Sequence, residues 1–318
     1  MIPKTELHLH LEGAAPPAFI RGLASEQGTR LDALFDERGD YRFEDFRQFL
    51  RTYEGATSVL RGPEEFARLT RAVLEESASH GVIYTEAFLS PDFCGGRDRG
   101  AWAEYLAAIE EAAAAVPEIE MRGIVTCIRH FGPDAARETA RCAAETAGRF
   151  VTGWGMGGDE GMGKAADFAW AFDCAREAGL GITVHAGEFG GPESVRDALA
   201  LRPSRLGHGV RSIEDLALVD RLAEDGVVLE VCPLSNVRLG LYEDVRRHPI
   251  ERLRDRGVKV TVSTDDPPFF GTTMTREYDA LAEAFGWTED DFRALNRISA
   301  EAAFCDDATR AKLLETFP

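Results

Sequence analysis

The sequence of 318 residues has no long apolar run and comparatively little positive charge. No stretch approaches the roughly 18 consecutive apolar residues that a membrane-spanning helix needs. Lysine and arginine number 36 against 55 aspartate and glutamate residues, which gives a formal net charge of −19. Because so acidic a chain repels phosphate backbones and anionic lipids, we expect neither nucleic acid nor a membrane surface as a partner. A neutral small molecule fits better, and the oligomeric state is left open.

Cysteine is also scarce and carries no recognisable motif. The six cysteines lie far apart and form no CxxC pair, so we interpret them as structural thiols in a reducing compartment. The N-terminal Met-Ile-Pro-Lys segment lacks the basic region, apolar region and cleavage site of a secretory signal. Together these absences predict a cytoplasmic protein.

Eight short runs rich in β-branched and apolar residues recur along the chain and predict strands. They lie at 5–10, 82–89, 121–128, 150–156, 181–186, 205–209, 227–233 and 259–265. Helical patterns separate them, at 165–178, 194–200, 213–225 and 251–256, and helical spacing continues near 288–297 and 308–314. Glycines just before several strands, at positions 81, 179, 226 and 257, are typical of helix C-termini. This alternation predicts a closed (β/α)8 TIM barrel in a single domain of residues 1–318.

The connection between the first two predicted strands is unusually long, at about 70 residues. Segments 43–60 and 63–80 within it have helical spacing. We interpret residues 12–80 as a helical insertion that forms a lid over the barrel mouth, with Phe46, Phe49 and Leu50 on its inner face. The alternative is a helical insertion packed on the outside of the barrel.

Histidines and acids gather at the ends of the predicted strands. His8 and His10 are two residues apart on the first strand, so their side chains share one face. His185 lies on the fifth strand and His208 ends the sixth, while Asp265 closes the eighth. The strands otherwise read as apolar. Because the C-terminal ends of barrel strands carry the active site, this pattern predicts a catalytic metal site.

Three imidazoles with one carboxylate suit Zn²⁺ and leave a position for water, although Fe²⁺, Co²⁺ and Mn²⁺ remain alternatives. Many dinuclear barrel hydrolases bridge two metals with a carboxylated lysine on the fourth strand, but segment 150–158 contains no lysine. We therefore predict one metal ion per subunit.

Six motifs lie at predicted strands: PKTELHLHLEGA, GMGGDE, TVHAGE, LGHG, EVCPLSN and STDDP. Through these motifs the whole chain resembles the adenosine/adenine deaminase family of the metal-dependent amidohydrolases. This resemblance implies that a zinc ion is bound by His8, His10, His185 and Asp265.

The resemblance also implies roles around the substrate. Glu188 would protonate the purine N1, and His208 would position the attacking water and help to deprotonate it. Asp266 would share a hydrogen bond with N7, while the backbone N–H of Gly158 would meet N3. Glu12, together with His10, would contribute to substrate binding.

The clues to the substrate conflict. Glu12 stands where animal nucleoside deaminases have an aspartate that contacts the ribose 5′-hydroxyl, and HGVR, with Arg211, looks more like the adenine deaminase branch. GGDE looks like the nucleoside branch. We expect adenosine and 2′-deoxyadenosine to be the substrates, with adenine or another 6-aminopurine derivative such as aminodeoxyfutalosine as the alternative. Arg211 would then meet an anionic substituent or form a surface salt bridge.

Other functions and residues stay open at this point. A mononuclear hydrolase of amides or phosphoesters and a catalytically silent purine-binding protein are the competing functions. His130 follows the third strand and either touches substrate or is structural, and Ser235 and Asn236 are expected to support the site. His248 lies in an RRHP turn that we expect to be solvated.

Overall fold

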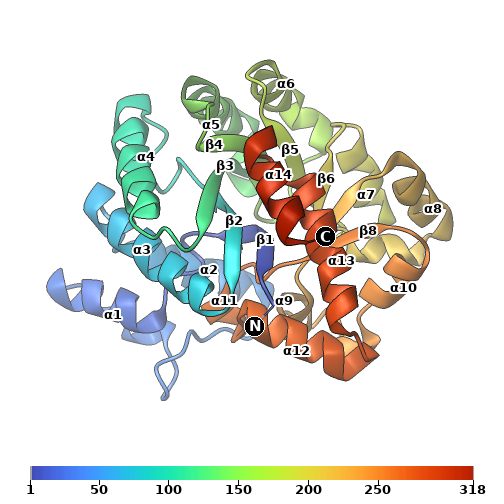
Figure 1. Ribbon diagram of the computed structural model, residues 1–318. Coiled ribbons are helices and arrows are strands. Elements are labelled where there is room, and N and C mark those ends of the chain that lie inside the picture. Colours follow the sequence, from blue (N-terminus) through green and yellow to red (C-terminus); the bar gives the residue numbers. More distant parts are fainter. Residues whose placement is uncertain (1, 318) are drawn as a thin grey trace.

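The computed structural model describes residues 2–317 and contains, within them, one sheet of eight parallel strands in chain order. The strands are β1 (Lys4–His10), β2 (Val82–Leu89), β3 (Glu120–Ile128), β4 (Val151–Gly157), β5 (Gly181–Ala186), β6 (Arg205–His208), β7 (Val228–Val231) and β8 (Lys259–Val262). A backbone bridge between Leu9 and Asp265 joins β1 to the segment after β8 and closes the sheet. The predicted (β/α)8 barrel is therefore confirmed (Figure 1).

Helices surround the barrel and connect its strands. They are α1 (Pro17–Glu26), α2 (Phe46–Thr57), α3 (Pro63–Ser79), α4 (Arg99–Ala114), α5 (Gly132–Thr146), α6 (Ala169–Glu177), α7 (Pro192–Leu199), α8 (Leu216–Asp225), α9 (Pro233–Arg238), α10 (Ile250–Asp255), α11 (Pro267–Phe270), α12 (Met274–Phe285), α13 (Glu289–Ala302) and α14 (Asp307–Thr316). Short 3-10 turns precede α6 and α8, so two of the predicted helical patterns are each divided into two pieces. No helix in residues 2–317 has both the length and the apolar character needed to cross a membrane.

The long first connection divides into parts with different surroundings. Helix α3 packs beside α4 on the outside of the barrel, as a helix between two barrel strands does. Helix α2 instead places Phe46, Phe49 and Leu50 along the wall of the pocket at the barrel mouth. Of the helices in the predicted 12–80 insertion, α2 is thus the one placed to act as a lid.

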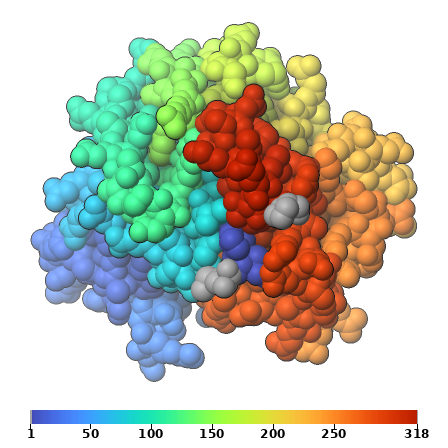
Figure 2. All heavy atoms as spheres, viewed as in Figure 1, coloured from blue at the N-terminus to red at the C-terminus, as the bar shows by residue number. Residues whose placement is uncertain are grey.

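The opposite end of the barrel is closed by the C-terminal helices. α13 packs against β1 and β8, and a small apolar cluster around Leu7, Tyr84 and Phe317 fills the space below the strands. Figure 2 shows α13 and α14 lying across this end of the molecule. Access to the barrel interior is therefore from the C-terminal ends of the strands.

The barrel interior is charged as well as apolar, so the expectation of otherwise apolar strands is wrong. Arg205 of β6 is buried and donates to two buried carboxylates, to Glu86 of β2 (Nη2–Oε2 2.6 Å) and to Glu230 of β7 (Nε–Oε1 2.6 Å). Thr183 of β5 also donates to Glu230 (2.9 Å). Buried charges are tolerated when each has a partner and hydrogen bonds, as here. These contacts form a line of buried polar side chains that runs through the barrel interior toward His8.

Strand β6 ends on a residue with left-handed backbone, and a second such residue lies three positions after the end of β8. His208 has φ 60° and Asp265 has φ 68°, in a region that L-residues other than glycine rarely adopt. Such conformations cost of the order of 1–3 kcal/mol each and are concentrated at functional sites. Strand β8 ends at Val262, three residues before the predicted end. Asp265 is instead hydrogen-bonded through its backbone to β1.

Candidate active site

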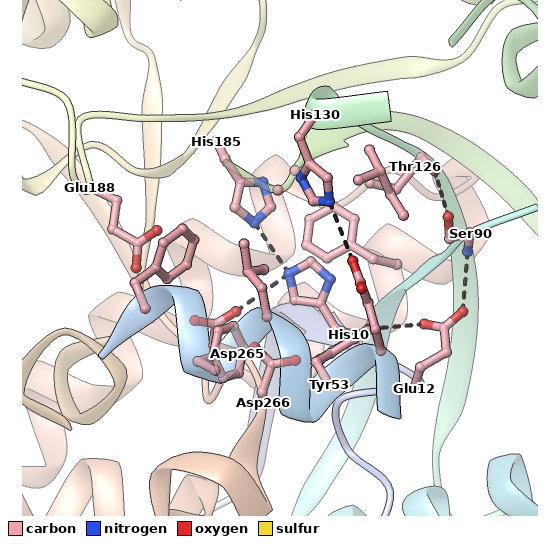
Figure 3. Close-up of a pocket in the computed structure, with 18 of the residues that line it drawn as sticks. His10, Glu12, Tyr53, Ser90, Thr126, His130, His185, Glu188, Asp265 and Asp266 are labelled. Carbon is pink, nitrogen blue, oxygen red and sulfur yellow. Dashed lines mark hydrogen bonds and ion pairs between the residues drawn. The ribbon is translucent and has the colours of Figure 1, made fainter. Parts of the chain in front are cut away.

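The four predicted metal ligands converge at the barrel mouth. His10 Nε2 lies 3.2 Å from His185 Nε2 and 3.4 Å from Asp265 Oδ1, and His8 Nε2 lies 3.5 Å from the same oxygen. Figure 3 shows His10 between His185 and Asp265. One ligand atom from each of the four residues falls within 4.8 Å of all the others. The fold thus brings together residues that lie up to 257 positions apart in the sequence.

These distances fit a tetrahedral metal ion. Zinc–ligand bonds of about 2.0 Å place the atoms of a tetrahedral ligand set about 3.3 Å apart. His8 Nε2 is buried without a hydrogen-bond partner among residues 2–317, as expected of a ligand aimed at a cation. Burial lowers the pKa of His10 to about 3 and that of His185 well below its usual value, so both imidazoles are neutral and able to ligate.

Two contacts outside the cluster hold the ligands in place. His8 Nδ1 lies 2.7 Å from Glu230 Oε2, so Nδ1–H donates to the carboxylate and Nε2 faces the cluster. Ser235 donates its hydroxyl to Asp265 Oδ2 (2.7 Å), as expected from the sequence. Burial disfavours ionised Asp265, but the nearby imidazoles of His8, His10 and His208 hold its pKa well below the usual value. The carboxylate is therefore available as an anionic ligand.

Replacing Glu230 with glutamine is expected to weaken metal binding by about 10–100-fold, because the amide is a poorer acceptor for His8 Nδ1–H. The measurement is the metal retained after dialysis against a graded series of chelator concentrations. The exposed Glu243, changed to glutamine, is the control. Equal retention in both variants would show that Glu230 does not orient His8.

Two acids that the sequence assigned to substrate also line the pocket. Burial, reinforced by the negative charges of Asp265 and Glu160, raises the pKa of Glu188 well above its usual value. Burial and the neighbouring Asp265 do the same for Asp266. Asp266 Oδ1 is buried and has no hydrogen-bond partner in residues 2–317. The pocket therefore presents two acids whose raised pKa values favour the protonated form, and one of them, Asp266, has an unpartnered oxygen.

A relay of two side chains supports His208, and it includes a histidine expected to be solvated. His248 is buried, 2% exposed, so that expectation is wrong. The backbone N–H of Ile250 donates to His248 Nδ1 (3.2 Å), which leaves the ring proton on Nε2 to donate to Asn236 Oδ1 (3.1 Å). The Asn236 amide then donates to His208 Nδ1 (3.3 Å). Neutral His208 consequently carries its proton on Nε2, the nitrogen 3.6 Å from Glu188.

Gly158 lies on the pocket wall with φ 91°, a backbone conformation that disfavours any residue with a side chain. The space around it is a second constraint. A Cβ atom at this position would lie 2.8 Å from His130 Nδ1. His130 itself accepts from the backbone N–H of Asp159 (3.2 Å), and its Nε2 lies 3.7 Å from Glu54 on α2. His130 thus links the segment after β4 to the helix at the pocket mouth.

Glu12 marks the far end of the pocket from Glu188 (Figure 3). Its two oxygens face the hydroxyl of Tyr53 and the backbone N–H of Ser90, both at 3.4 Å. Burial raises the pKa of Glu12 to about 7 despite these hydrogen bonds. The ring of Tyr53 packs 6.0 Å from that of Phe93, so the carboxylate lies in an aromatic surround.

Arg211 pairs with Glu214 (Nε–Oε1 2.7 Å) and also donates to the backbone carbonyl of Phe189. The surface salt bridge considered for this residue is therefore present. With its guanidinium held by these partners, Arg211 gives no support to a site for an anionic substituent.

Sequence reasoning missed several residues that shape the site. Glu230 was an isolated charge inside the apolar run VVLEVCP, and Glu160 was part of the GMGGDE motif but received no role. A single charged residue in a strand that is buried on both faces was a usable signal for Glu230. Tyr53 had no such signal, since its role depends on where α2 packs.

Comparison with known proteins places this site in context. A sequence model of the adenosine deaminase family matches residues 3–317. The chain is 49% identical to adenine deaminase of Rhizobium rhizogenes, across 98% of both chains, and 48% identical to that of Agrobacterium fabrum, across 98% of this chain and 96% of the relative.

Solved structures of a deaminase and of an amidohydrolase are also similar to this chain. The crystal structure of adenine deaminase from Arthrobacter aurescens superposes with a TM-score of 0.91 at 30% identity, covering 100% of this chain and 98% of the other. A zinc-bound amidohydrolase from Burkholderia ambifaria has a TM-score of 0.88 at 27% identity, covering 99% and 89%. The chain therefore belongs to the adenosine deaminase family and is an aminopurine deaminase, a hydrolase that acts on a C–N bond of an amidine.

Proposed function

We propose that the protein is a cytoplasmic, zinc-dependent adenine deaminase that converts adenine and water to hypoxanthine and ammonia. His8, His10, His185 and Asp265 would hold the zinc ion, since their ligand atoms have tetrahedral spacing. When bound, such an ion lowers the pKa of water from 15.7 to roughly 7 and so supplies a nucleophile at neutral pH.

The side chains around the cluster perform the proton transfers and orientation. Glu188, kept protonated by its buried and anionic surroundings, donates its proton to N1 and makes C6 electrophilic. His208 donates from Nε2 and orients the water that adds to C6. This favours the positioning part of the predicted role of His208, because its Nε2 already carries a proton. Of the two protons of that water, one passes to the amino group, which leaves C6 as ammonia, and the other returns to Glu188, while the water oxygen becomes the 6-oxo group.

The purine ring would be held by a side chain and a backbone group of the pocket wall. Asp266 Oδ1 is buried and unpartnered among the described residues, and because its raised pKa keeps the carboxyl group protonated, Asp266 suits a hydrogen bond donated to N7. The N–H of Gly158 is proposed to meet N3, with the left-handed backbone allowing the ring to approach. Helix α2 would act as the lid, because Phe46 packs against Phe189 across the mouth with ring centroids 4.2 Å apart.

The observation that carries adenine over adenosine is the carboxylate of Glu12 at the far end of the pocket. Free adenine has an N–H on its five-membered ring, whereas adenosine carries ribose there. Two donors, Tyr53 and Ser90, already face the Glu12 carboxylate, and its remaining acceptor capacity matches a ring N–H. The relatives named adenine deaminase support this alternative rather than the preferred expectation from the sequence, which was adenosine.

The test is a side-by-side kinetic comparison of adenine, adenosine, AMP and aminodeoxyfutalosine with the zinc-loaded protein. We expect kcat/KM for adenine to exceed that for adenosine by roughly 10³-fold or more, because a site that hydrogen-bonds a substrate N–H strongly rejects an analogue lacking it. A higher kcat/KM for any of the other three substrates would refute the assignment.

Replacing Glu12 with glutamine is expected to lower kcat/KM for adenine by about 10–100-fold, the cost of weakening a hydrogen bond to a charged group. The same steady-state assay measures it, and Ser90→Ala is a suitable comparison because the Ser90 contact to Glu12 comes from the backbone. If Glu12→Gln instead left adenine turnover intact, Glu12 would not contact the base.

A further inference from the structure

The carboxylate of Glu160, three residues after the end of β4, is surrounded by donors from the loop after β5 and from α7. The backbone N–H groups of Glu188, Phe189 and Gly190 donate to Oε2 at 3.2, 2.8 and 2.7 Å. Gly187 N–H donates to Oε1 (2.5 Å), as does the Ser194 hydroxyl. Four consecutive amides thus converge on one carboxylate that is only 8% exposed. Such a nest is a strong anion-binding arrangement of backbone.

The loop sequence is adapted to this contact at two glycines. Gly187 has φ 70°, a left-handed conformation that turns the chain as it leaves β5. At Gly190, a Cβ atom would lie 2.6 Å from Glu160 Oε1, so only glycine permits the close approach. These two glycines therefore allow the loop backbone to fold around Glu160, so that the four amides point at its carboxylate.

The loop carries Glu188, whose own side chain has little to fix it. Its carboxyl group makes no hydrogen bond to residues 2–317, and His208 Nε2 lies 3.6 Å from Oε2. The position of the Glu188 carboxyl group therefore depends on the conformation of the loop backbone that carries it. That backbone is tied on one side to His185 in β5 and on the other to Glu160.

We propose that Glu160 is a positioning residue for the deamination, whose carboxylate gathers the 187–190 amides and thereby sets the proton-donating carboxyl of Glu188 over the substrate. This rests on the proposed function, in which Glu188 is the acid. The negative charge of Glu160 has a second effect in the same direction, since after burial and Asp265 it contributes to the raised pKa of Glu188. Position and protonation of the acid would both depend on one residue.

A double-mutant cycle tests this. Glu160→Gln keeps the shape but replaces one acceptor oxygen with a donor that faces loop N–H groups. We expect kcat for adenine to fall by about 10²-fold, the usual effect of a small misplacement of a catalytic group, with KM changed less than about threefold. We expect Glu160→Gln/Glu188→Gln to be no slower than Glu188→Gln alone, because both changes remove the same proton donation.

The other outcomes are distinguishable. A double variant slower than Glu188→Gln by the full Glu160→Gln factor would mean a purely structural role and overturn the proposal, as would an unchanged kcat in folded Glu160→Gln. Near-normal turnover of Glu188→Gln would instead overturn the proposed function itself. Metal content and melting temperature are measured on every variant, and Glu193→Gln, an exposed change at the start of α7, is the control expected to match wild type.

Gly190→Ala disturbs the same contact from the loop side and serves if Glu160→Gln does not fold. Its added methyl group would displace the loop from Glu160 without changing a titratable residue. We expect a similar loss of kcat with zinc content unchanged. Unimpaired kcat in folded Gly190→Ala would show that the loop position does not govern the acid.

Discussion

Glu188→Gln is expected to lower kcat for adenine by about 10²–10⁴-fold while the protein retains its metal and binds purine. The amide has nearly the same shape as the carboxyl group but has no acidic proton to give to N1. Steady-state kinetics on adenine, elemental analysis and binding of the product hypoxanthine measure the three parts of this prediction. The exposed Glu193→Gln is the control for a change of charge near the site.

The pH dependence follows from the direction of the Glu188 shift. Its pKa is raised by burial and by the negative charges of Asp265 and Glu160, so the carboxyl group is protonated at neutral pH. Activity that needs this proton is present below the raised pKa and is lost as the pH rises through it. Wild-type kcat should therefore decline on the alkaline side, and Glu188→Gln should lack that decline. An alkaline limb that survives in the variant belongs to another group.

Asp265→Ala is expected to remove most of the bound metal and, with it, nearly all deaminase activity. The change deletes the one carboxylate of the ligand cluster, whose Oδ1 lies 3.4 and 3.5 Å from the two β1 imidazoles. Elemental analysis after dialysis against chelator measures the loss without depending on turnover.

The neighbouring Asp266→Ala is a matched comparison for this variant. Asp266 contributes no atom to the ligand cluster, so this variant should keep its metal while its KM for adenine rises. Equal metal content in the two variants would rule out Asp265 as a ligand. The pair also separates loss of metal from loss of substrate contact at adjacent positions.

Strand alternation made part of the site predictable from sequence. In TELHLH the side chains of His8 and His10 share a face because strand residues alternate, and their contact with His185 requires only that β1 and β5 belong to one barrel. The position of Asp265 was predicted within the strand pattern, although β8 ends earlier. The left-handed backbone at Asp265, not an extended one, delivers its carboxylate to the cluster.

Other parts of the site required the packed structure. His248 looked like a surface residue in an arginine-rich turn, yet it is buried and reaches His208 through Asn236. Nothing local distinguishes a buried turn from an exposed one, because burial depends on which distant elements cover it. Tyr53 likewise meets Glu12 only because α2 folds over the barrel mouth.

The sequence by itself therefore determined the barrel and the candidate metal ligands at the strand ends, and its resemblance to the deaminase family supplied the chemical class of the reaction. The barrel and the candidate ligands depend on periodicity and on residue types at strand ends, which are local properties. Only the tertiary structure decided which residues support the site. Glu230 contacts His8, Asn236 contacts His208, and the Glu160 carboxylate accepts from the backbone N–H of Glu188. Such partners are set by the register of strands and the paths of loops, and these emerge only when segments 28 to 222 residues apart pack together.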